Sequence, residues 1–157
     1  MIRLTAQWKR VRSASRTLAL LTLLLAVPAH AEGLGHPRDA VDVFVKATAA
    51  GDPDALAALY APNAIFLAPD TPVVSGRDEI RKVFARNFAA GPNTIAFTDV
   101  LVDGEGTRAL ILWSWNTQIS PPGRDPVRLS GRSLVYFIRG ETGWLISADM
   151  MQVTTQR

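Results

Sequence analysis

Asp149 is the acidic residue best placed to do chemistry, because it lies in an apolar, strand-like segment near the end of the chain. In a β-strand, side chains two residues apart share one face of the sheet. Over residues 144–155 this alternation groups Leu145, Ser147, Asp149, Met151 and Val153. A carboxylate among apolar neighbours has a raised pKa and can act as a base or bind a polar ligand group. The alternative is a carboxylate at the sheet rim that is hydrated or paired with an arginine.

Two tryptophans, Trp113 and Trp115, share one face of another predicted strand. Inside a pocket they would stack on a flat or apolar ligand. On an outer face they would form the centre of a dimer interface, where aromatic residues are enriched. The sequence alone leaves both readings open.

Other polar side chains have simpler interpretations. Tyr60 and Asn63 lie where a short helix meets a strand, and we count both as candidate pocket residues. Alternatively, Tyr60 is a core residue whose hydroxyl has a hydrogen-bond partner. Asn63 is alternatively a turn residue, because asparagine favours turn conformations. Arg128 and Arg132 share a strand face that could hold an anion, although a solvated or dimer-facing surface explains them better.

Composition removes several kinds of catalysis. The chain has no cysteine, and His36 is the only histidine after residue 31. A histidine-rich zinc site, a cysteine nucleophile and a Ser-His-Asp triad are therefore not expected. Any acid–base catalyst would have to be Asp, Glu, Tyr or Lys. We predict neither a metal site nor a cofactor.

The first 31 residues have the pattern of a secretory signal peptide. Five basic residues precede an apolar run over 17–27, and Ala29-His30-Ala31 follows as a cleavage site. The apolar run is about half the roughly 20 residues that a membrane-spanning helix needs. We therefore expect cleavage after Ala31, export to the periplasm, and no membrane attachment afterwards.

Removal of this segment also changes the charge. The whole chain has 17 basic and 14 acidic residues, and the five basic residues of the signal segment leave 12 against 14. Nucleic-acid binding is not expected, because it needs a clustered basic surface.

The rest of the chain reads as a single α+β domain over residues 32–157. Helical spacing and cap residues predict helices from Asp39 to Gly51, from Pro53 to Pro62, and from Gly76 to Gly91. A short strand is expected at 64–68 and a loop at 69–76. The later segments 94–103, 107–119, 127–139 and 144–155 alternate and are joined by turns, which predicts an antiparallel meander. Helices followed by a meander favour helices packed on one face of the sheet.

These elements resemble the nuclear transport factor 2-like superfamily, close to its SnoaL-like and ketosteroid-isomerase-like branches. The residues that carry the resemblance are Gly51-Asp52, Ala55-Leu56, Leu59-Tyr60-Ala61, Asn63-Ala64, Gly76-Arg77, Glu79-Ile80, Phe84 and Gly143-Trp144. The resemblance implies a cone, in which a strongly curved antiparallel sheet wraps around about three N-terminal helices. It also implies a pocket at the open end and often a dimer. It does not imply one function, because this fold hosts enzymes, binding proteins and assembly domains.

The resemblance also argues against one reaction. Ketosteroid-isomerase-like members use a carboxylate base with a tyrosine and a protonated carboxylic acid as donors. By motif counting, these positions fall on Ala68, Phe44 and Ser133. All three are replaced, so that route of proton transfer is disfavoured.

The leading hypothesis is an exported domain that binds a small, largely apolar molecule and is expected to form a homodimer. The expected pocket residues are Tyr60, Asn63, Trp113, Trp115, Ser133, Ser147 and Met151, with Asp149 as the candidate catalytic residue. Two alternatives remain. One is a SnoaL-like isomerase, cyclase or hydratase with Asp149 as base, and the other is a dimeric assembly or interaction domain.

Overall fold

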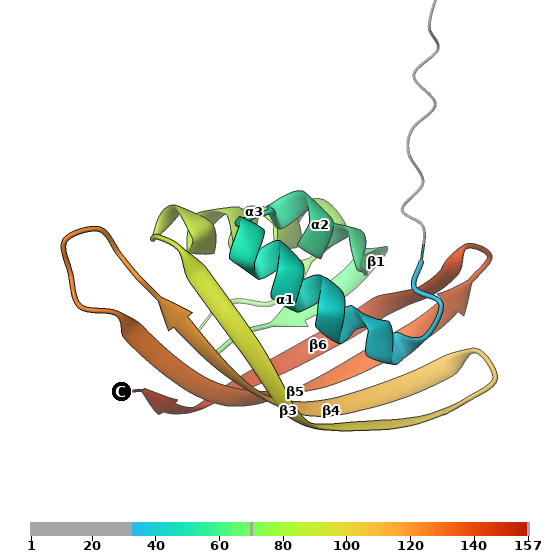
Figure 1. Cartoon of the computed structure of the whole chain (residues 1–157). Helices are drawn as coiled ribbons and strands as arrows, with labels where there is room; N and C mark the ends of the chain where they lie inside the picture. Colours follow the sequence, from blue (N-terminus) through green and yellow to red (C-terminus); the bar gives the residue numbers. More distant parts are fainter. Residues whose placement is uncertain (1–32, 70, 157) are drawn as a thin grey trace, which may run out of the picture.

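The computed structural model describes residues 33–69 and 71–156, so the predicted signal peptide lies outside the described residues. The α+β fold is confirmed: one six-stranded, curved, open sheet carries the helices on its concave face (Figure 1). The strand order is β2-β1-β6-β5-β4-β3. Among the described residues, no helix has the length and apolar character needed to cross a membrane.

The first helix begins and ends close to where the sequence predicts, and the second begins where it predicts. A 3-10 turn, η1 (Pro37–Asp39), leads into α1 (Ala40–Ala50), which ends at Gly51. Gly51 has φ 63°, a left-handed conformation that glycine adopts without strain. The next residue, Asp52, caps α2 (Pro53–Ala58) by accepting hydrogen bonds from the amides of Asp54 and Ala55.

The following segment differs from expectation. The short helix was expected to reach Pro62, but it ends at Ala58, and β1 spans Tyr60–Leu67. This strand lies parallel to β6, with Tyr60 opposite Ile146 and Ile65 opposite Ala148, and it bulges between these pairs. Pro62 falls within that bulge, where its missing N–H removes no bond of the ladder.

The expected loop at 69–76 contains a short edge strand, β2 (Val74–Ser75), which pairs with β1. The third helix, α3 (Arg77–Ala89), then crosses the concave side. The meander is confirmed, with strands β3 (Asn93–Glu105), β4 (Arg108–Ile119), β5 (Val127–Gly140) and β6 (Gly143–Gln156). β3, β5 and β6 run longer than predicted, and β4 begins one residue later than predicted. All three neighbouring pairs are antiparallel.

A β-bulge in β6 decides which residues point to the helices. Phe137 of β5 pairs with Ile146, whereas Tyr136 pairs with Ala148, so Ser147 is the extra residue. The bulge shifts the alternation by one, and Ile146 and Asp149 are both buried although they are three residues apart. The predicted common face of Leu145, Ser147 and Asp149 is therefore wrong.

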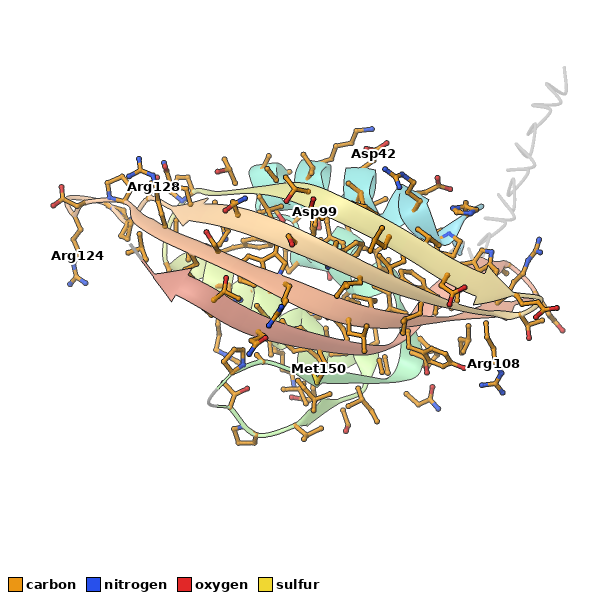
Figure 2. All side chains as sticks on the ribbon, turned by 90° about the horizontal axis from the view of Figure 1, so that it is seen from below. Asp42, Asp99, Arg108, Arg124, Arg128 and Met150 are labelled. Carbon is orange, nitrogen blue, oxygen red and sulfur yellow. The ribbon has the colours of Figure 1, made fainter. Side chains whose placement is uncertain are left out.

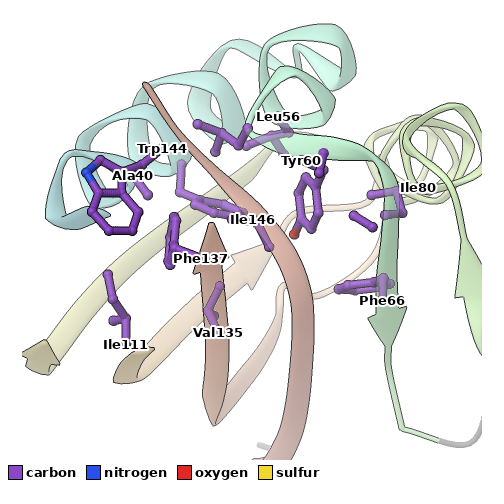
Figure 3. Packing of buried hydrophobic residues seen from close by; sticks show 14 of the residues in the cluster. Ala40, Leu56, Tyr60, Phe66, Ile80, Ile111, Val135, Phe137, Trp144 and Ile146 are labelled. Atoms are coloured by element: carbon purple, nitrogen blue, oxygen red, sulfur yellow. The ribbon is translucent and has the colours of Figure 1, made fainter. Parts of the chain in front are cut away.

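The core lies between the helices and the concave face of the sheet. Figure 3 shows Leu56 of α2 and Ile80 of α3 in one cluster with Tyr60, Val135, Phe137 and Ile146 of the sheet. Trp144 packs beneath Ala40 at the start of α1. None of the helices formed by residues 33–69 and 71–156 lies on the convex face (Figure 2).

Candidate functional site

A cavity of about 240 Å³ lies on the concave side of the sheet. Residues from α1, α2 and α3 and from the sheet strands β1, β3, β4, β5 and β6 line it. The lining residues are Phe44, Thr48, Leu56, Tyr60, Phe66, Phe84, Asn87, Phe88, Asn93, Ile95, Phe97, Trp113, Trp115, Thr117, Ile119, Leu129, Ser133, Asp149 and Met151. Its volume is below the roughly 300–1,000 Å³ typical of drug-sized ligand sites.

Aromatic rings make up much of the wall, with eight of the 19 lining residues being Phe, Tyr or Trp. One group joins Phe44, Phe97 and Trp113, whose ring centroids lie 4.8–5.9 Å apart. A second group joins Tyr60, Phe66 and Phe84 at 5.9–6.4 Å. Phe84 of α3 also contacts Phe44 of α1 at 6.5 Å, so the two groups form one network.

Tyr60 and Asp149 form the polar centre of this wall. The Tyr60 hydroxyl donates a hydrogen bond of 2.8 Å to Oδ2 of Asp149. Parallel pairing of β1 with β6 also places Phe66 directly beside Asp149. The other carboxylate oxygen, Oδ1, is buried and has no hydrogen-bond partner among the described residues. A buried oxygen without a partner is uncommon in folded proteins and calls for an explanation.

Burial controls the charge of this pair. It raises the pKa of Asp149 from 3.8 to about 6, against the smaller opposing effect of the hydrogen bond from Tyr60. Burial, and then the negative charge and hydrogen bond of Asp149, raise the pKa of Tyr60 well above its usual value. Tyr60 therefore remains a donor at neutral pH, while Asp149 changes charge close to physiological pH.

A second polar contact holds the side chain of Trp115 in place. Nε1 of Trp115 donates a hydrogen bond of 3.1 Å to Oγ of Ser133. The Trp115 ring lies over Gly131, where a Cβ atom would come within 2.2 Å of the ring. Glycine at this position of β5 therefore makes room for the indole, as glycine within a strand often does for a closely approaching group.

Polar side chains also lie on a more exposed part of the lining. Asn87 of α3 is exposed, and Asn93 and Thr117 are half-buried. The Thr117 hydroxyl lies 2.7 Å from Oδ1 of Asn93 and donates to it. These groups are accessible to water, unlike Oδ1 of Asp149.

The structure brings together most of the residues singled out from the sequence. Tyr60, Trp113, Trp115, Ser133, Asp149 and Met151 all line the cavity. Asn63 is exposed, and Ser147 lies on the bulge; neither is among the lining residues. Trp113 and Trp115 are only 2% and 4% exposed on the concave side, so they do not form an outer surface.

Sequence reasoning missed the pairing of Tyr60 with Asp149, which are 89 residues apart. It also missed Phe66, Phe84 and Phe97 as lining residues. Their helical and alternating spacing indicates burial, but it does not separate a cavity wall from a packed core.

The two arginines discussed above lie outside the cavity. Arg128 and Arg132 are exposed, and their side chains donate hydrogen bonds to Gln118 and Gln152 respectively. Within the described part of the chain, no cluster of three or more His, Cys, Asp or Glu residues could hold a metal ion.

Comparison with known families identifies the class of protein. The family model of the SnoaL-like domain matches residues 41–142, and the chain belongs to this family. No curated protein sequence gives a significant match.

Solved structures agree on the fold. A proposed scytalone dehydratase from Novosphingobium aromaticivorans is similar, with a TM-score of 0.70 and 14% identity over 76% of this chain and 83% of that one. A proposed dehydratase of the NTF2-like family from Streptomyces avermitilis has a TM-score of 0.66 and 24% identity over 75% and 94%. A ketosteroid isomerase-like protein from Erwinia carotovora atroseptica has a TM-score of 0.64 and 16% identity over 75% and 93%. At these identities the similarity establishes the fold.

Proposed function

We propose that the protein binds a small, largely apolar molecule in the cavity. The supporting observation is the aromatic wall around a single buried carboxylate with a free oxygen. An apolar site with few polar groups is the usual composition of small-molecule sites, in which the polar groups fix orientation. The small volume favours a compact ligand such as a single substituted ring.

Filling the cavity is expected to weaken this binding. Met151 lines the cavity, and the next residue along β6, Gln152, is exposed and bonds to Arg132. Met151→Trp should weaken binding of indole or benzyl alcohol at least about tenfold, equivalent to about 1.4 kcal/mol. Ligand-observed NMR measures the affinity, and Gln152→Trp is the matched control. Equal affinities in the two variants would count against a ligand site in this cavity.

A second candidate function is proton-transfer catalysis of the isomerase, cyclase or dehydratase kind, with Asp149 as base. It is favoured by the pKa of about 6, which suits a general base near neutral pH. The names of the similar dehydratases and the isomerase-like protein make these reaction types a reasonable place to start.

The catalytic role can be tested on a molecule that native mass spectrometry finds bound to the purified protein. Asp149→Asn should lower its turnover by roughly 10²–10⁴-fold, the usual contribution of a general base. Tyr60→Phe removes the hydrogen bond that lowers the pKa of Asp149. The pH dependence of turnover should then move to higher pH. Unchanged turnover in Asp149→Asn would exclude this role.

We also propose export to the periplasm, on the basis of the signal-peptide pattern in residues 1–31. Homodimer formation through the convex face of the sheet is a further proposal. Figure 2 views this face, where Met150 is exposed on β6.

A further inference from the structure

The cavity holds one acidic group and no basic partner for it. Among the described residues that line it, Asp149 and Tyr60 are the only titratable ones, and none is Lys, Arg or His. Tyr60 satisfies Oδ2 alone, and Oδ1 is left without a donor. An ionised carboxylate is costly to bury unless a positive group or further donors pair with it. Nothing within the described lining supplies that charge.

The surrounding rings add a second, independent preference. Phe66 is the strand neighbour of Asp149, and Tyr60 and Phe84 pack against Phe66 at centroid distances of 6.4 and 6.0 Å. The faces of aromatic rings carry negative electrostatic potential and attract organic cations. A carboxylate and several rings on one wall are complementary to a positively charged group on a compact apolar body.

We propose that the ligand of this cavity is a small organic amine bound as its ammonium ion, with the N–H groups directed to Oδ1 of Asp149 and the apolar part among the aromatic rings. This inference rests on the proposed function and names its ligand class. A neutral alcohol could donate one hydrogen bond to Oδ1, but it would leave the carboxylate charge uncompensated. A carboxylic acid would place a second negative charge beside Asp149.

Three probes of similar shape separate these chemistries: benzylamine, benzyl alcohol and benzoate. At pH 7.5, calorimetric titration of the purified protein should show benzylamine binding about tenfold more tightly than benzyl alcohol, because hydrogen bonds to charged groups are stronger than neutral ones. Benzoate should not bind measurably. Asp149→Asn should remove the preference for the amine, so that benzylamine and benzyl alcohol bind this variant with about equal affinity.

The pH dependence gives a further readout. Because the free carboxylate has a pKa of about 6, the affinity for benzylamine should fall about tenfold between pH 7.5 and pH 5 as Asp149 becomes protonated. Tyr60, the only other titratable lining residue, stays neutral throughout this range because its pKa is raised. The affinity for benzyl alcohol should not fall in parallel.

The outcomes distinguish a failure of the amine inference from a failure of the ligand-binding proposal. Binding of benzyl alcohol as tightly as benzylamine would overturn the amine inference and leave the ligand-binding proposal in place. The same holds for an amine preference that survives in Asp149→Asn. Failure of all three probes to bind would count against both.

Discussion

The Asp149→Asn variant should become more stable relative to the wild-type protein by roughly 2–3 kcal/mol when the pH is raised from 4 to 7.5. The figure follows from the displacement of the pKa of Asp149 from 3.8 to about 6, at about 1.36 kcal/mol per unit. Because Asp149 is only 5% exposed, solvent screening should reduce this free-energy difference only slightly. The asparagine has no carboxylate to ionise and can still accept the hydrogen bond from Tyr60.

The direction follows from proton binding by the two states. Between pH 3.8 and about 6 the folded protein keeps the Asp149 proton, whereas the unfolded chain loses it. The stability that this group contributes is therefore complete below about pH 3.8 and is lost as the pH rises through about 6. Above that range the folded wild-type protein carries the full cost of a buried charge.

Urea unfolding of both proteins at a series of pH values measures the effect. The difference in unfolding free energy between variant and wild type cancels the contributions of the other carboxylates. Asp103→Asn, which removes an exposed carboxylate on β3, is the matched control and should show no comparable trend. A constant difference across the pH range would mean that Asp149 is not buried as an isolated acid.

This cost is informative about function. An apolar or amide side chain at position 149 would give a more stable protein at neutral pH, yet the chain keeps a carboxylate there. Ligand-binding and catalytic sites often retain groups that lower the stability of the folded protein because the function requires them. A bound ammonium group would compensate the buried charge, so the amine inference and the pH effect rest on the same oxygen atom.

Local signals predicted the helical part of the fold well. Gly51, Asp52 and Pro53 specify the end of one helix and the start of the next through backbone geometry and capping, which depend on only a few neighbouring residues. The alternation in residues 94–155 predicted the antiparallel meander for the same reason.

The site was harder to predict because it depends on non-local pairing. The orientation of Asp149 depends on the bulge at Ser147, and the strict alternation predicted from residue 145 assigned it to the wrong set of neighbours. Its contact with Tyr60 requires β1 to lie parallel to β6, whereas hairpin reasoning considers only antiparallel neighbours. Neither feature has a short sequence motif, so Asp149 was identified as a candidate without its partner.

The convex face of the sheet carries the second large expected effect. The register of the strands aligns four exposed apolar side chains in a row across β3 to β6: Leu101, Leu112, Leu134 and Met150. They are 38–64% exposed, and none of the helices in the described part of the chain covers this face (Figure 2). A continuous apolar row on an open sheet favours burial against another surface. A second copy of the same chain supplies a matching row under two-fold symmetry.

Leu134→Glu should therefore convert a homodimer into a monomer at micromolar concentration, because a carboxylate at the centre of the row would be desolvated opposite its symmetry copy. Sedimentation velocity measures the change, and Met150→Glu should act in the same way. Ala49→Glu adds the same charge on an exposed position of α1 and should leave the dimer intact. Circular dichroism checks that the variants remain folded.

A wild-type protein that sediments as a monomer, or a Leu134→Glu dimer as stable as wild type, would contradict assembly through this face. Since Trp113 and Trp115 lie on the opposite side of the sheet, loss of the dimer should leave ligand binding in the cavity unchanged.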